Sequence, residues 1–414
     1  MADSNPDASG GGIKSGKKPA FKMTPHPSGK ESHGKGMQIL RALSFSIYFM
    51  TCAFTIVITQ LIGAPLYFIN KEMFYAYMAT TKRYFGITIT TMTHVWANTL
   101  VRISGDASVA GQIKATANGG VEFNFPERAV LIANHQIYTD WLYLWWVAYA
   151  NRPSMHGHLF IILKESLKYI PVFGVGMMFY GFIFMSRKMS TDRPRLSHRL
   201  KQLQAPKTDP RTGQTYLDPM WLLLFPEGTN LSGNGRRKSA NWAEKTGVKD
   251  AEHVLLPRST GTFFILNELK GSVEYVYDCT VAYEGIPRGK YGEQIFGLNS
   301  TYFEGLPPKS VNLYWRRFRI ADIPLDDAET FDKWLREEWY KKDALMEEYM
   351  VKGRFPPLPS AKTEATEDES KHDEYVETEV RPRYPFEVLQ IFVVVAIVGL
   401  MWHNVAKVIR AFTG

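Results

Sequence analysis

Residues 130–141 read Val-Leu-Ile-Ala-Asn-His-Gln-Ile-Tyr-Thr-Asp-Trp, so an unbroken apolar run ends on a polar segment. Such a run is typical of a central strand whose two faces are both covered by helices. In an open α/β sheet, ligands bind beyond the carboxyl ends of the strands. The stretch therefore predicts an α/β fold with a functional site that begins at His135.

The spacing of His135 and Asp140 suggests a working pair. If a helix opens just after His135, Asp140 lies one turn in, and its carboxylate can accept a hydrogen bond from the imidazole. A carboxylate fixes the tautomer and the basicity of a histidine, and a hydroxyl nucleophile needs such a positioned base at neutral pH. The alternative is a loop histidine beside a helix-capping aspartate, and this fragment alone leaves both open.

Further apolar runs continue the α/β pattern from residue 101 onward. They are 129–133, 159–163, 221–225 and 275–282, with helical patterns between them. This alternation predicts a mixed, mostly parallel central sheet flanked by helices. An amphipathic pattern over 331–349 predicts a helix that Gly353 and two prolines end. We expect the catalytic domain to span 101–353.

A second polar segment, Phe225-Pro226-Glu227-Gly228-Thr229, follows another wholly apolar strand. Gly228 lets the backbone come close to a bound group, while Glu227 and Thr229 offer an acceptor and a donor to a polyol or a phosphate. On its own, Pro-Glu-Gly is a turn. Together with His135, it predicts that two polar strand ends converge.

Arg187 lies just beyond a strand-like segment, 181–185. A guanidinium at a strand end can bind phosphate through two parallel hydrogen bonds, which a lysine cannot do. The alternative is an arginine on a solvated edge of the sheet. Arg258 adds a second cation beside polar donors, ahead of a helical pattern.

Two charge-free apolar runs, 42–70 and 388–406, lie near the two ends of the chain. A spanning helix needs about 20 apolar residues, so both runs predict membrane contact. We expect N-terminal membrane helices over 37–100 and a C-terminal transmembrane helix over 385–414. Gly63 and Pro65 interrupt the first run, so a re-entrant hairpin and a full crossing are both open.

Composition sets the remaining expectations. Residues 1–36 are rich in Gly, Ser, Pro and Lys and are expected to be disordered, and 354–384 is expected to be an acidic linker. The net charge of +8 could attract nucleic acid, anionic lipid or phosphorylated molecules. No nucleic-acid-binding motif is present, so we do not expect nucleic acid as a partner. The two cysteines form neither a disulfide framework nor a metal site.

Four motifs, taken in order, resemble those of the glycerolipid acyltransferase family. They are His135 with Asp140, Gly181–Arg187, Phe225–Thr229 and Val281–Pro287. Leu256–Gly261 and Val276–Asp278 look like the branch of lysocardiolipin and lysophosphatidylinositol acyltransferases, including its fungal members. Ser259 stands where that branch often has threonine, which keeps the hydroxyl.

The resemblance implies an acyl-CoA-dependent lysophospholipid O-acyltransferase that needs no acyl-enzyme. It implies that His135 and Asp140 are catalytic, and that Arg187, Glu227, Gly228 and Thr229 bind the acceptor and its phosphate. Two further basic residues, Lys164 and Arg258, become candidates for contacts with coenzyme A or phosphate. No metal or resident cofactor is expected, because acyl-CoA is a co-substrate.

The partners expected are a lysophospholipid, acyl-CoA and the lipid bilayer. We expect the protein in the endoplasmic reticulum membrane with its active site facing the cytosol, and lysophosphatidylinositol as the acceptor. The alternatives are lysophosphatidic acid or lysocardiolipin as acceptor, a transacylase independent of coenzyme A, and a non-catalytic membrane scaffold.

Overall fold

The computed structural model describes residues 25–186, 188–209, 211–359 and 375–413. At its centre lies an eight-stranded sheet with the order β12-β1-β11-β10-β4-β9-β5-β6. The last five of these strands are parallel to one another, so their carboxyl ends meet at one edge. The prediction of a mixed, mostly parallel sheet is confirmed. The strands are β1 (Leu100–Gly105), β4 (Arg128–Ala133), β5 (Leu159–Lys164), β6 (Ile183–Met185), β9 (Met220–Leu224), β10 (Tyr275–Tyr283), β11 (Ser310–Arg319) and β12 (Val376–Glu379).

Alternate side chains of the central strand β4 enter two separate cores. Ala129, Leu131 and Ala133 pack with α3 and α4, whereas Val130 and Ile132 pack with α6, α7, α8 and α10. Both faces of the strand are thus buried, which explains its unbroken apolar run. The helices are α3 (Lys71–Trp96), α4 (Asp140–Ala150), α6 (Met189–Leu203), α7 (Gly233–Thr246), α8 (Ser259–Leu269) and α10 (Ala328–Lys352).

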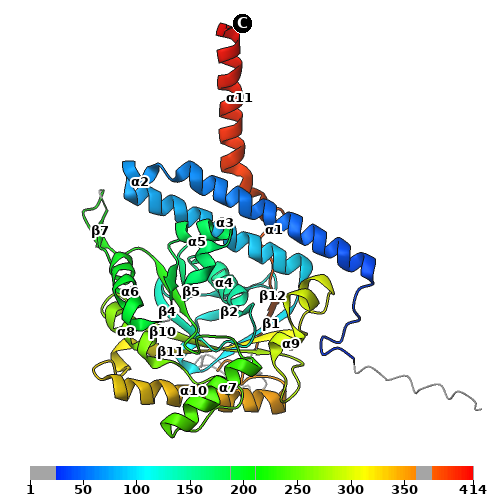
Figure 1. The fold of residues 1–414 in the computed structure, drawn as a ribbon, viewed down its shortest axis with the longest axis vertical. Helices are drawn as coiled ribbons and strands as arrows, with labels where there is room; N and C mark the ends of the chain where they lie inside the picture. The colour runs from blue at the N-terminus through cyan, green and yellow to red at the C-terminus, as the bar shows by residue number, and fades with distance from the viewer. Residues whose placement is uncertain (1–24, 187, 210, 360–374, 414) are drawn as a thin grey trace, which may run out of the picture.

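Two long helices, α1 (Lys35–Gly63) and α3, form a hairpin across one end of the domain (Figure 1). Gly63 leaves room for a side chain of α3: a Cβ there would be 2.1 Å from Cε1 of Tyr77. The Tyr77 hydroxyl donates a hydrogen bond to the carbonyl of Thr59 at 2.8 Å. Pro65 then starts the short helix α2 (Leu66–Ile69), which completes the turn. The interruption seen in the sequence is therefore the bend of a helical hairpin.

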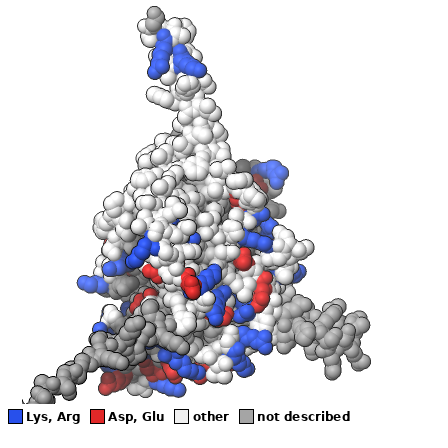
Figure 2. Space-filling view, turned by 90° about the vertical axis from the view of Figure 1, so that its right-hand side faces the viewer, with Lys and Arg blue, Asp and Glu red and all other residues white. Residues whose placement is uncertain are grey.

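Within the described residues, two helical segments are long and apolar enough to cross a membrane, 35–69 and 387–413. They differ in burial, because 39% of the most apolar stretch of the first is covered by protein and only 6% of the second. The second ends in α11 (Val393–Thr413), which stands away from the domain (Figure 1). Figure 2 shows this helix as a nearly uncharged column with basic side chains at its tip, where the sequence has Lys407 and Arg410.

Two predictions about the ends of the domain are wrong. Residues 25–34, predicted to be disordered, pack against the domain: Ser28 is buried, and the ring of His26 lies edge-on to that of Phe296 at 5.9 Å. Residues 376–379, predicted to lie in the linker, form β12 and pair with β1 at the edge of the sheet. Composition misses both because the contacts are remote along the chain. Residues 1–24 and 360–374 lie outside the described residues, so disorder there stays a prediction.

Candidate active site

His135 and Asp140 form the predicted pair. Nδ1 of His135 lies 2.8 Å from Oδ2 of Asp140, and the carboxylate is fully buried while 17% of the imidazole side chain is exposed. The predicted helix start is wrong, because α4 begins at Asp140 itself. The segment before it is a turn, which the N–H of Ile137 closes by donating to the same carboxylate oxygen at 3.1 Å. The five-residue spacing therefore brings His135 and Asp140 together through a tight turn before α4, and not through the first turn of a helix.

A third donor reaches the carboxylate from the end of β10. The hydroxyl of Tyr283 donates to Oδ1 of Asp140 at 2.5 Å, and both groups are buried. No sequence pattern singles out Tyr283. Its only signal in the sequence is its place within the fourth motif, directly after the predicted strand 275–282.

Asn134 fixes the backbone from which His135 projects. Its side-chain amide donates to the carbonyl of Val281 at 3.0 Å and accepts from the N–H of the same residue at 2.7 Å. These bonds extend the pairing of β4 with β10 past its last backbone pair. On the other side, the imidazole stacks on Phe225 with ring centres 4.3 Å apart. The first and second polar segments therefore meet at His135.

The predicted residues Gly228, Thr229 and Arg258 lie together in this region. Gly228 has a φ of +72°, a conformation that favours glycine. The backbone N–H of Arg258 donates to the carbonyl of Pro226 at 2.8 Å, and its Cδ would lie 3.4 Å from a Cβ placed on Gly228. Arg258 is exposed and Thr229 is half-buried. The loop before α8 thus brings a cation to the edge where His135 projects.

Glu227 lies beneath this surface, pointing into the protein. One carboxyl oxygen accepts from the indole N–H of Trp339 on α10 at 3.3 Å, and the other has no partner within the described residues. Burial raises the pKa of Glu227 to about 8, so the carboxyl is mostly protonated at neutral pH. Its position joins the second motif to α10, which the sequence analysis did not anticipate.

The structure says less about the other two predicted cationic residues, Lys164 and Arg187. Lys164 is exposed at the carboxyl end of β5, the same edge of the sheet. Arg187 lies outside the described residues, so its role stays a prediction. Its neighbours Ser186 and Lys188 both donate backbone N–H groups to the carboxylate of Asp192, at 2.9 and 3.1 Å. Asp192 therefore holds the backbone of both Ser186 and Lys188.

A buried network of ion pairs joins α10 to the strands β10 and β11. Nζ of Lys342 is fully buried and lies 2.6 Å from Oδ1 of Asp278, while Arg316 binds the other oxygen at 2.6 Å. Glu338 binds Arg316 at 2.8 Å. Burial acts to raise the pKa of Asp278, but the two cations outweigh it and lower that pKa. One signal for this network was present in the sequence: Lys342 follows the same helical spacing as the apolar residues of the predicted helix. These residues are Phe331, Leu335, Trp339, Met346 and Tyr349.

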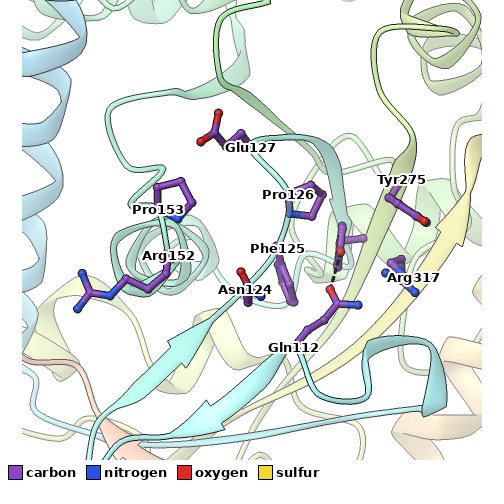
Figure 3. Close-up of a pocket in the computed structure, with 10 residues that line it drawn as sticks. Gln112, Asn124, Phe125, Pro126, Glu127, Arg152, Pro153, Tyr275 and Arg317 are labelled. Carbon is purple, nitrogen blue, oxygen red and sulfur yellow. Dashed lines mark hydrogen bonds between the residues drawn. The ribbon is translucent and has the colours of Figure 1, made fainter.

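A surface cavity of about 380 Å³ lies at the opposite end of the sheet, where β10 starts (Figure 3). Its lining includes Gln112, Arg152, Tyr275 and Arg317. Figure 3 shows that Arg152 points away from Tyr275, so the polar groups of the lining do not all meet at one point. The cavity does not include His135, and it is not the candidate active site.

Fold and site together define a class of protein: an α/β domain that carries a His–Asp pair at the carboxyl edge of its sheet and is attached to apolar helices. A family model described as Acyltransferase matches residues 119–284, and one described as Acyltransferase C-terminus matches 301–386. With the relatives below, these matches show that the chain belongs to the acyltransferase family. The second match reaches past β12, in agreement with a domain that does not end at residue 353.

The similarity to known proteins covers most of the chain. It is 37% identical to an uncharacterized acyltransferase of Schizosaccharomyces pombe over 317 residues, 77% of this chain and 87% of that protein. It is also 37% identical to the 2-acyl-1-lysophosphatidylinositol acyltransferase of Saccharomyces cerevisiae over 364 residues, 82% and 91% of the two chains. Lysocardiolipin acyltransferase 1 of Danio rerio is 34% identical over 226 residues, 54% and 53%. The resemblance drawn from the motifs is confirmed.

Proposed function

We propose that the chain is an acyl-CoA-dependent lysophospholipid O-acyltransferase with His135 as general base. The observation that carries this proposal is the bond from Nδ1 of His135 to the buried carboxylate of Asp140, which leaves Nε2 as the proton acceptor. Nε2 takes the proton of the acceptor hydroxyl while its oxygen attacks the thioester carbonyl. The tetrahedral intermediate then expels the coenzyme A thiolate, which takes the proton from the imidazolium.

We infer lysophosphatidylinositol as the acceptor, because a relative that covers most of the chain is named for it. Given a panel of lysolipids and one acyl-CoA, the purified protein should use lysophosphatidylinositol about tenfold better in kcat/KM, roughly 1.4 kcal/mol of transition-state binding. Equal or better rates with lysophosphatidic acid or lysocardiolipin would reject this acceptor. Transfer that runs on a phospholipid donor and is not stimulated by acyl-CoA would identify a transacylase.

For the membrane, we propose that the α1–α3 hairpin lies in one leaflet and that only α11 crosses. Near its start, α1 is tied to the domain by Arg41, which donates to the carbonyl of Tyr302 at 3.0 Å. Near its end, Gln60 donates to the carbonyl of Gly176 at 3.3 Å. A helix held to the domain at both ends has one face left for lipid, and its exposed apolar side chains follow a helical spacing: Leu43, Ile47, Phe54, Ile58 and Leu61.

We propose further that His135 faces the cytosol at the endoplasmic reticulum membrane, because acyl-CoA is made available there. With α11 as the one crossing, the C-terminus would then lie in the lumen. Two glycosylation reporters test it, one inserted in residues 361–374 and one appended on a spacer after Gly414. We expect a glycosidase-sensitive mass shift for the appended reporter only. Sugar on the 361–374 reporter would defeat the proposal. The natural sequons at Asn230 and Asn299 are poor reporters, because both side-chain amides are hydrogen-bonded to glutamates, at 2.7 and 2.6 Å.

A further inference from the structure

The carboxylate of Asp140 is fully buried, and within the described residues its only ion-pair partner is His135. A buried carboxylate depends on hydrogen-bond donors to remain ionised and oriented. Oδ2 receives two donors, Nδ1 of His135 and the N–H of Ile137. Oδ1 receives the hydroxyl of Tyr283 at 2.5 Å. Tyr283 therefore holds the oxygen that the histidine loop does not hold.

Tyr283 comes from a different part of the fold than the loop that carries His135. It is the last residue of β10, the strand beside β4, and its ring packs between Tyr143 of α4 at 6.1 Å and Phe296 at 6.4 Å. The backbone of the neighbouring Glu284 donates to the carbonyl of Ser310 at 3.0 Å and continues the pairing with β11. The hydroxyl is thus presented from a rigid element, as a precise hydrogen bond requires.

Other titratable groups lie near Asp140 and Tyr283 without a hydrogen bond to the Asp140 carboxylate. Tyr143 on α4, Glu227 after β9 and Cys279 on β10 interact electrostatically with Asp140. Tyr302 near α1 lies close to Tyr283, and Lys342 on α10 lies close to Glu227 and Cys279. Burial, with Asp140 close by, holds the pKa of Tyr283 well above its ordinary value, so its hydroxyl stays a donor throughout the working pH range. A pH profile in that range therefore does not report the titration of Tyr283 itself.

We propose that Tyr283 is a positioning residue that, through Asp140, sets the orientation and basicity of His135. The inference rests on the proposed general-base mechanism. Removing the donor from Oδ1 leaves more negative charge on the carboxylate, which then stabilises the imidazolium more strongly. In the variant, His135 would therefore become protonated, and stop acting as a base, at a higher pH than in the wild type. The carboxylate would also be less constrained and would orient the imidazole less well.

The test is Tyr283→Phe, which removes only the hydroxyl. We expect turnover to fall about tenfold, since a hydrogen bond to a charged group contributes roughly 1.5 kcal/mol or more. We also expect the acidic limb of the kcat/KM pH profile to move up by roughly half a pH unit or more. The matched control is Tyr277→Phe on the same strand and face, where a buried hydroxyl donates to Gln112 at 2.6 Å, the dashed bond of Figure 3. It should leave the profile unchanged.

A double mutant separates positioning through Asp140 from simple packing. If Tyr283 acts through the carboxylate, Tyr283→Phe should add little to the loss already caused by Asp140→Asn. An unmoved acidic limb, or losses that multiply in the double mutant, would overturn the proposal even if turnover falls. Failure of the general-base mechanism is a separate result, namely near-normal activity in His135→Ala.

Discussion

His135→Ala should lower kcat by about a hundredfold or more, the loss expected when general-base catalysis is removed. Among the described residues of the site, the imidazole is the group that is both held by a buried carboxylate and partly exposed to an incoming hydroxyl. Its removal deletes a side chain at the surface, stacked on Phe225, and leaves the strands behind it intact. The measurement is steady-state kinetics with labelled acyl-CoA and lysophosphatidylinositol on purified protein, together with a melting curve.

The chain offers a matched control in His253, another histidine bound to a carboxylate. Its Nε2 lies 2.7 Å from Oε2 of Glu347, and 13% of its side chain is exposed. His253→Ala should keep near-normal turnover, because this pair does not contact Asp140. Asp140→Asn should fall with His135→Ala, because the amide cannot hold the same tautomer. A folded His135→Ala protein that turns over like the wild type would reject the mechanism.

The histidine motif could be predicted because its signals are local. An apolar run buried on both faces is visible in the letters of β4, and the polar residues follow it directly. Tyr283 could not be predicted, because it meets Asp140 across 143 residues. A strand pattern gives no register, and the pairing of β10 with β4 is what brings the hydroxyl to the carboxylate.

The edge strand β12 shows why composition misled. Val376 and Thr378 are buried while Glu377 and Glu379 are exposed, the alternation of a half-buried strand. Four residues are too short a pattern to outweigh an acidic neighbourhood that indicates a solvated linker. Pairing with β1 decides the outcome, and the partner lies far away in the sequence. The same limit hid the contact of Glu227 with Trp339 on α10.

Asp278→Asn should strongly destabilise the domain. Lys342 is fully buried, and within the described residues Asp278 is its only carboxylate partner. Removing one partner of a buried pair leaves an uncompensated charge and costs about 3–5 kcal/mol. At 2–4 °C per kcal/mol, the melting temperature should fall by roughly 6–20 °C. The check is an apparent melting temperature in detergent at a fixed scan rate.

The pH dependence and two further variants identify the cause. Burial lowers the pKa of Lys342, so in Asp278→Asn the folded state releases the ammonium proton of Lys342 more readily than the unfolded state does. The stability of the variant should therefore rise with pH.

The double variant Asp278→Asn with Lys342→Met removes both charges and leaves Arg316 paired with Glu338. It should recover most of the lost stability. Glu329→Gln, which breaks an exposed pair on the same helix, should leave the melting temperature unchanged. A double variant that melts as low as Asp278→Asn would show that the loss comes from the altered strand and not from a stranded cation.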